Sequence, residues 1–399
     1  MRGAFETPPM RSADRERTSL VELAALFLRL GATAFGGPAA HIAMMRDEVV
    51  HRRSWLTDAR FLDLLSATNL IPGPNSTEMA IHVGWARRRW AGLIVAGTCF
   101  IVPAALLTGA LAWAYVRFGT LPQATWLLWG VKPVILAIVL QALWKLAPAA
   151  APSWGLRGVG AVAAVAAVLG VHELVVLLGA GVLVATASRL VGGRGQGPLS
   201  QLLPAVPVMP AVAASASAAA VTVTLPGLFG VFVKIGSVLF GSGYVLLAFL
   251  RADLVHRLHW LTEGQLIDAV AAGQITPGPV FTTATFVGYI LAGPAGAVVA
   301  TCGIFLPAFV FVAASGPLVP RLRASRLAAA FLDGVNVASL ALMAVVTVEL
   351  GRAAIVDVPT ALLGAASAFL LLRFKLNSTW LVLGGAAAGV ASHLLGIAR

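Results

Sequence analysis

An apolar part of the chain is interrupted by the sequence Asn69-Leu-Ile-Pro-Gly-Pro-Asn75, and the triplet Pro-Gly-Pro returns at residues 277–279. Proline cannot donate a backbone hydrogen bond, and glycine tolerates dihedral angles that other residues avoid, so a helix is expected to break at each triplet. A new helix is predicted to begin at about Asn75. A kink within a continuous helix is the alternative, and the recurrence of the triplet makes it the weaker explanation.

The two triplets belong to an internal duplication. Residues 29–77 align with residues 234–282 without a gap, and 17 of these 49 pairs are identical. An offset of 204 continues the alignment through Gly84/Gly288 and Gly130/Gly334. Duplicated apolar segments with Gly/Pro interruptions at matching places are typical of secondary transporters and point to their binding sites.

Composition indicates a membrane protein. Hydrophobic residues make up 59% of the 399 residues and charged residues only 11%, whereas about a quarter of the residues of soluble domains are charged. The alternation that a β-barrel requires is absent, so the expected fold is an all-α polytopic membrane protein. Its apolar stretches predict ten to thirteen membrane spans.

The basic residues predict two inverted halves. Arg87-Arg88-Arg89 precede the span that begins near Gly92, whereas the matching place near Gly293 is uncharged and the cluster of Arg321, Arg323 and Arg326 follows the matching span. Because basic ends tend to stay cytoplasmic, this change predicts opposite orientations. The expected domains are a cytoplasmic tail at 1–18, a first repeat at 19–191, a linker at 192–210 and a second repeat at 211–399, whose apolar run 211–223 would supply an extra span.

Other classes of protein are not supported. The net charge of +12 is scattered between apolar spans, so membrane lipid is an expected partner and nucleic acid is not. Cys99 and Cys302 both lie inside apolar stretches, which argues against a disulfide. No metal site is expected from the scattered histidines, and no zinc-protease, nucleophile-elbow or Walker motif is present, so neither an enzyme nor a bound cofactor is expected.

The first triplet is predicted to lie in a re-entrant segment. Arg52-Arg53 and Arg87-Arg88-Arg89 bracket a 33-residue stretch, which would enter the membrane and return if both basic ends stay on one side. Thr57 and Thr262 are predicted N-caps of the descending helices. A helix that begins inside the membrane directs unpaired N–H groups and a partial positive charge toward the cavity before it, which suits an anion.

The turns at 35–38 and 240–243 follow the same logic, so four half-helix starts are expected near the midplane. Neighbouring hydroxyl and amide groups would add donors for the oxygens of an anion. The predicted substrate-binding residues are Gly36, Gly37, Pro72, Gly73, Pro74, Asn75, Ser76, Thr77, Lys132, Gly241, Ser242, Pro277, Gly278, Pro279, Thr282 and Asn336.

Charged residues at apolar positions complete the predicted site. Lys132 lies mid-span, where a cation costs about 2.5–3.5 kcal/mol on insertion scales, and a transported dianion would offset that cost. The alternative is a lysine that snorkels or that pairs with an acid such as Asp333. The basic residues Arg29, Arg46, Lys234 and Arg251, at matched positions of the halves, are expected to attract an anion, with interfacial anchoring or salt bridging as the alternative. The candidate carriers of a coupling proton are Glu78, Asp63 and Asp268, and a structural role is favoured for the two aspartates.

Three motifs together resemble the chromate ion transporter family in its two-domain form. They are Phe-Gly-Gly-Pro at 35–38, Trp-Leu-Thr at 55–57 and Pro-Gly-Pro at 72–74, each with a second-half counterpart. The resemblance covers nearly the whole chain and implies export of chromate across the bacterial cytoplasmic (inner) membrane, chromate resistance, and sulfate as a similar anion. Ser242-Gly243 stands where the first half has Gly37-Pro38, which argues against equal roles of the two turns. Uptake of sulfate or another oxyanion, a passive anion channel and a homo-oligomer stay open as alternatives.

Overall fold

The computed structural model describes residues 18–35, 37–119, 121–191, 222–240, 245–374, 376 and 378–395. Within these ranges the chain forms helices and no strand, which confirms the expected all-α fold. The predicted tail and linker, most of the extra span at 211–223, and the predicted site residues Gly36, Gly241 and Ser242 lie outside the described residues.

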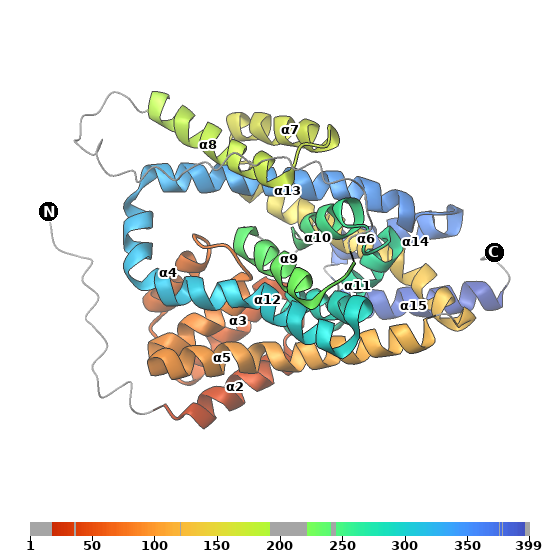
Figure 1. Cartoon of the computed structure of the whole chain (residues 1–399), viewed down its shortest axis with the longest axis horizontal. Coiled ribbons are helices and arrows are strands. Elements are labelled where there is room, and N and C mark those ends of the chain that lie inside the picture. The colour runs from red at the N-terminus through yellow and green to blue at the C-terminus, as the bar shows by residue number, and fades with distance from the viewer. Residues whose placement is uncertain are drawn as a thin grey trace, which may run out of the picture.

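The described helices of the two halves follow one another in the same order (Figure 1). The first half consists of α2 (Leu20–Thr33), α3 (Gly37–Arg46), the π-helical segment η1 (Asp47–Arg52), α4 (Asp58–Thr68), α5 (Asn75–Phe118), α6 (Pro122–Ala150), α7 (Trp154–Val168) and α8 (Glu173–Val191). The second half consists of α9 (Leu225–Val238), α10 (Leu246–Leu250), the π-helical segment η2 (Arg251–Arg257), α11 (Glu263–Ile275), the 3-10 turn η3 (Val280–Thr282), α12 (Thr283–Ala324), α13 (Arg326–Ala354), α14 (Val358–Phe374) and α15 (Ser378–Leu394).

The halves also share unusual backbone geometry. Ser54 and His259, at matched positions, have φ angles of 52° and 53°. Arg89 and Gly293 are likewise matched and have φ angles of 51° and 62°. Positive φ is uncommon for residues other than glycine, so its repetition shows that the duplication preserved conformation as well as sequence.

The predicted helix starts are confirmed. The Thr57 hydroxyl accepts a hydrogen bond from Arg60 N and caps α4. The Thr262 hydroxyl accepts one from Gln265 N, and the Gln265 side chain accepts one from Thr262 N, which forms a capping box at α11. Helix α5 begins at Asn75, directly after the first triplet.

Helix α5 folds back on itself, and α12 does the same. The backbone leaves the helical region at Arg88 and Arg89, and a Cβ added at Gly84 would lie only 2.2 Å from the carbonyl oxygen of Gly92 on the returning arm. Arg87, at the end of the first arm, donates a hydrogen bond of 3.2 Å to the carbonyl of Trp55, just before α4. The stretch from α4 to Arg87 therefore begins and ends at one place, which confirms the re-entrant segment.

The two halves are inverted and interlocked. Figure 1 shows the second arms of α5 and α12 running in opposite directions, from orange to gold and from teal to blue. Helices α6 and α13 are also antiparallel, because residues 132–139 lie near 347–354 whereas residues 138–150 lie near 336–340. Helix α6 packs against α14 and α15, and α13 packs against α7 and α8, so each half holds the last two helices of the other.

The chain is a multi-pass integral membrane protein. Among the described residues, four helices are long and apolar enough to cross a membrane. They are Asn75–Phe118, Thr125–Ala150, Val280–Ser315 and Arg326–Ala354, and three shorter apolar helices are Trp154–Val168, Leu225–Val238 and Val358–Phe374. Large apolar side chains such as Leu106, Val162 and Val298 are exposed, as contact with lipid requires.

The second triplet is expected to tolerate no side chain at its glycine. Gly278 has a φ of 87°, and an added Cβ would lie 2.8 Å from both the Gly31 carbonyl oxygen and the Ala104 Cβ. The variant Gly278→Ala should therefore lose about 1–3 kcal/mol of stability, measured as a lower melting temperature of the detergent-purified protein. Gly230→Ala is the matched control, because nothing lies within 4 Å of its added Cβ. Equal melting temperatures of the two variants would contradict the tight contact.

Candidate functional site

The two Pro-Gly-Pro loops are held by the ends of helices from opposite halves. Gly73 N donates a hydrogen bond of 2.8 Å to the carbonyl of Leu239, and Gly278 N donates one of 2.9 Å to the carbonyl of Ala34. Ala34 and Leu239 directly follow α2 and α9, where carbonyls lack a partner within the helix. The two bonds are repeat counterparts, and they bring the helix interruptions of both halves to one place.

A cavity of about 770 Å³ lies at this junction. It is lined by residues at all four predicted interruptions: Pro38 and Ala39, Pro74 to Ser76, Phe240 and Val245, and Pro279 to Phe281. Helices α6 and α13 line another part of it with Gln141, Lys145, Asn336 and Ser339. Lys145 is the one charged side chain among the described lining residues, and no aspartate or glutamate is among them.

Two polar side chains of the cavity have no partner of their own within the described residues. The Ser339 hydroxyl is buried and has no hydrogen-bond partner within the described residues. Lys145 takes part in none of the ion pairs among the described residues. Other groups are held in place, since Asn75 Nδ2 donates to Asn69 Oδ1 at 2.8 Å. Cationic, hydroxyl and amide groups thus surround a cavity without a described carboxylate.

The structure brings together part of the predicted substrate-binding set. The residues Pro74, Asn75, Ser76, Pro279 and Asn336 line the cavity, and Gly37 directly precedes the lining residue Pro38. The residues Pro72, Gly73, Pro277 and Gly278 are not among its lining residues, and the two glycine N–H groups are used in the bonds between the halves. Thr77 and Thr282 are fully buried outside the lining, and the Thr282 hydroxyl donates to the carbonyl of Pro279.

Comparison with known proteins shows the family of the chain. Residues 21–185 and 226–390 match the family described as Chromate transporter. The chain belongs to the chromate transporter family. It is 34% identical to the chromate transport protein of Cupriavidus metallidurans over 386 residues, which cover 94% of each chain. It is 33% identical to the chromate transport protein of Pseudomonas aeruginosa over 394 residues, with 94% of this chain and 92% of the relative covered.

A third relative is the probable chromate transport protein of Synechococcus elongatus, which is 31% identical over 359 residues, with 87% and 88% of the two chains covered. No solved structure matches this chromate transporter. The resemblance inferred from the three motifs is therefore confirmed over both halves.

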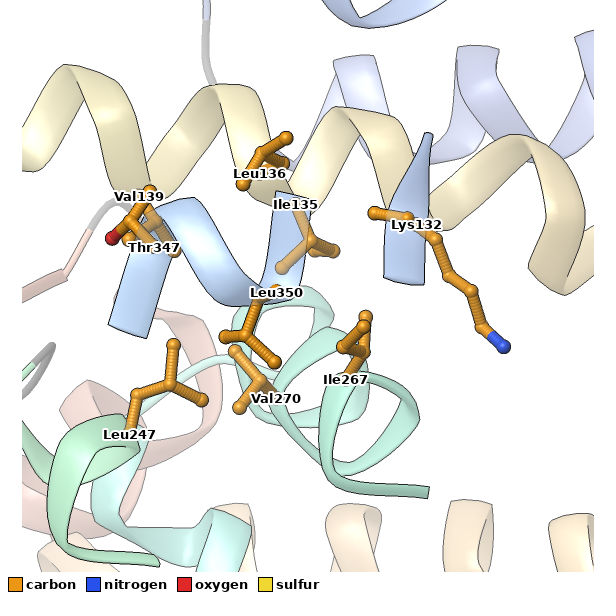
Figure 2. Close-up of a pocket in the computed structure, with 10 residues that line it drawn as sticks. Lys132, Ile135, Leu136, Val139, Leu247, Ile267, Val270, Thr347 and Leu350 are labelled. Carbon is orange, nitrogen blue, oxygen red and sulfur yellow. The ribbon is translucent and has the colours of Figure 1, made fainter. Parts of the chain in front are cut away.

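In this chromate transporter Lys132 lies outside the open cavity. Its Nζ is 3.5 Å from Oδ1 of Asp268, and the Tyr115 hydroxyl donates a hydrogen bond of 3.0 Å to the other oxygen of Asp268. The acidic partner is therefore Asp268 and not Asp333. Figure 2 shows the ammonium end of Lys132 pointing away from a small apolar gap, which its aliphatic stem helps to line.

The four cations that were expected to attract an anion are all paired with carboxylates and do not line the cavity. The pairs are Arg29–Glu48 at 2.5 Å, Lys234–Asp253 at 2.5 Å, Arg46–Asp58 at 2.8 Å and Arg251–Glu263 at 2.6 Å. The first two pairs occupy matched positions of the repeats, and so do the last two. The four cations therefore form the salt bridges that the alternative predicted, at matched positions of both halves.

Glu78 is a buried acid directly behind the first triplet. Its side chain is fully buried, and neither carboxyl oxygen has a hydrogen-bond partner within the described residues. A Cβ added at Gly73 would lie 2.3 Å from Glu78 Oε1, so the side chain reaches back to the loop. One turn further along α5, His82 is also buried, and its Nε2 has no described partner. Asp63, by contrast, is half-buried on α4.

Sequence reasoning missed five polar residues that line the cavity: Asn69, Gln141, Lys145, Ser339 and Ser378. One signal for two of them was available. Gln141 and Lys145 are four residues apart and therefore share one face of α6. Nothing in the sequence indicated which part of α6 the cavity would meet, and Lys132, in the middle of α6, was the more conspicuous cation.

The pairing of Lys132 with Asp268 makes a prediction. Lys132→Ala should leave an acid that is only 5% exposed without its cation and should cost roughly 2 kcal/mol of stability, seen as a lower melting temperature. Adding Asp268→Asn to this variant should recover most of the loss, because the uncompensated charge is removed. Additive losses in the double variant would show that the two side chains do not interact.

Proposed function

We propose that this chromate transporter is a secondary transporter that exports chromate across the bacterial cytoplasmic membrane and thereby confers chromate resistance. The observation that carries the proposal is the cavity of about 770 Å³, which has Lys145 as its one charged residue and no carboxylate among its described lining residues. Relatives from three organisms are named chromate or probable chromate transport proteins, which supports chromate as the cargo.

The physical chemistry of the cavity favours an anion. Helix α5 starts at its wall with Asn75, so backbone N–H groups and the positive end of a helix dipole add to the charge of Lys145. A cation and an anionic charge 4 Å apart gain about 4 kcal/mol at the effective dielectric constant of a protein surface. The hydroxyl and amide groups offer neutral donors for the remaining oxygens of a tetrahedral oxyanion.

Export is the direction that the membrane potential favours. Moving one elementary charge across the membrane is worth about 2.3 kcal/mol per 100 mV, so a dianion leaving a negative interior gains about 4.6 kcal/mol per 100 mV. Proton exchange is the second source of energy in this proposal. Glu78 is its carrier, because an ionised carboxylate without a hydrogen-bond partner is costly in such surroundings and the loop beside it borders the cavity.

Two alternatives make different predictions. Sulfate is also a tetrahedral dianion, and the groups around the cavity do not distinguish it from chromate, so sulfate uptake by the same fold is the second candidate. A passive channel would need a continuous path. Among the described residues, the space beside residues 132–139 of α6 is an apolar gap of about 10 Å³, which supports a carrier with one open side.

Expression of the protein in a chromate-sensitive bacterium should lower cellular chromate and raise tolerance, because chromate leaves through the cavity. Everted vesicles should accumulate chromate when their interior is positive, and excess sulfate should compete. The measurement is chromate flux at a set potential and pH gradient, with empty-vector membranes as the control. Unchanged flux in membranes that contain the protein would exclude chromate as the cargo, and sulfate flux in the inward direction would favour the second candidate.

Lys145 should set the charge preference of the cavity. In a chain with Cys99→Ala and Cys302→Ala, Lys145→Cys should reduce chromate flux about tenfold, which corresponds to about 1.4 kcal/mol. An aminoethyl thiosulfonate reagent restores a positive charge at this cysteine and should recover flux, whereas a sulfonatoethyl reagent should not. Trp144→Cys is the matched control, since Trp144 is 74% exposed on α6 and does not line the cavity. Equal effects of the two reagents on Lys145→Cys would show that charge at this position is unimportant.

Glu78→Gln should abolish the dependence of chromate flux on the pH gradient and leave flux driven by the potential. The glutamine keeps the size of the side chain but cannot exchange a proton. The measurement is vesicle flux with and without a pH gradient at a fixed potential, and Asp63→Asn on the same re-entrant segment is the comparison. An intact pH response in Glu78→Gln, or its loss only in Asp63→Asn, would assign the coupling elsewhere.

A further inference from the structure

The small apolar gap beside Lys132 is the repeat counterpart of the open cavity (Figure 2). Six of the ten residues that line the gap stand at positions matched to cavity residues, by offsets of 204 or 205. The matched pairs, gap residue first, are Lys132/Asn336, Ile135/Ser339, Leu136/Leu340, Leu350/Leu146, Ala354/Ala150 and Leu247/Ile42. The duplication therefore built the same pocket twice.

The two pockets lie at different levels along one helix pair. Residues 132–139 of α6 and residues 347–354 of α13 line the gap, whereas residues 138–150 of α6 and residues 336–340 of α13 line the cavity. Because α6 and α13 are antiparallel, the two pockets are displaced from each other along the helix pair. Both Pro-Gly-Pro loops contribute lining residues to the open cavity.

The gap is closed by contacts that the cavity lacks. Its volume is about 10 Å³, against about 770 Å³ for the cavity, and apolar side chains from α6, α10, α11 and α13 fill it, as Figure 2 shows. Lys132, which lines the gap with its aliphatic stem, forms an ion pair with Asp268. Glu349 precedes the lining residue Leu350 on α13, and it forms an ion pair with Arg251 of η2.

The ion pair of Arg251 with Glu349 is present beside the gap and has no counterpart beside the cavity. Arg251 binds Glu263 and Glu349 together, whereas the matched Arg46 binds Asp58, which is the counterpart of Glu263. The counterpart of Glu349 is Lys145, an offset of 204 away. A lysine cannot form an ion pair with Arg46, so the Arg251–Glu349 pair between η2 and α13 has no equivalent between Arg46, the last residue of α3, and Lys145 of α6.

We propose that the gap is a second vestibule of the same transport path, closed in this structure, and that it opens when the Arg251–Glu349 pair breaks while the cavity around Lys145 closes. In that state Lys132 exchanges its Asp268 partner for the transported anion, at the position that Asn336 occupies in the present cavity. The inference rests on the proposed function, because it assigns the second access route of the same carrier. The solute class is a tetrahedral oxyanion, as for the open side.

The test measures the exposure of matched positions to a membrane-impermeant thiol reagent. Ser339→Cys reports the cavity and Ile135→Cys reports the gap, each in a chain with Cys99→Ala and Cys302→Ala, in right-side-out and in everted vesicles. Ser339→Cys should react from one side only and Ile135→Cys should be protected. Adding Glu349→Gln should raise the rate at Ile135→Cys at least fivefold, from the opposite side, and should lower the rate at Ser339→Cys. Glu173→Gln, at the start of α8, is the matched control and should change neither rate.

A second measurement keeps the test valid if Glu349→Gln fails to reach the membrane. Saturating chromate should raise the labelling rate of Ile135→Cys in the protein with Glu349 intact, because turnover passes through the state with the gap open. Labelling of Ile135→Cys from the same side as Ser339→Cys, or no change in either experiment, overturns the inference. Chromate flux is measured in the same vesicles, so absent flux counts against the proposed function, whereas normal flux with unchanged labelling counts against the second vestibule alone.

Discussion

Backbone groups inside a membrane must find hydrogen-bond partners within the protein, and this constraint organises the transporter. Each Pro-Gly-Pro loop breaks a helix, and each loop glycine donates its N–H to a carbonyl at the end of the first helix of the other half, Gly73 to Leu239 and Gly278 to Ala34. The two bonds satisfy groups that a broken helix leaves open. They also join the halves, so the place where helices start inside the membrane is the place where the cavity forms.

The duplicated ion pairs lie within each half and not at the cavity. The pairs Arg29–Glu48 and Arg46–Asp58 recur in the second half as Lys234–Asp253 and Arg251–Glu263, and all four stand away from the cavity lining. Because the same pairs hold both halves, they maintain the fold of each repeat. The halves differ at two aligned positions of α6 and α13, where Lys145 corresponds to Glu349 and Lys132 corresponds to Asn336. An inverted repeat with these substitutions is open at one end and closed at the other.

The local features of the fold could be predicted, and the assembly of the site could be predicted only in part. The helix starts at Thr57, Thr262 and Asn75 follow from residue chemistry within a few positions, and all three are confirmed. Of the predicted binding residues, Pro74, Asn75, Ser76, Pro279 and Asn336 reach the cavity. Lys132 does not, because α11 brings Asp268 to it. Gln141, Lys145 and Ser339 were missed, because lining depends on which faces of α6 and α13 are left uncovered.

The sequence by itself determined that the chain is a duplicated, inverted helical membrane protein with breaks at Pro72–Pro74 and Pro277–Pro279. Composition, charge asymmetry and the absence of a backbone N–H in proline are local properties, so they can be recognised in the sequence itself. Only the tertiary structure decided which cation faces an open cavity and which is held by an acid. Lys132 and Lys145 lie thirteen residues apart on α6, and the packing of α13 and the last two helices against α6 separates an apolar gap from a cavity of about 770 Å³. That outcome depends on contacts between segments that lie far apart in the sequence, which no local pattern specifies.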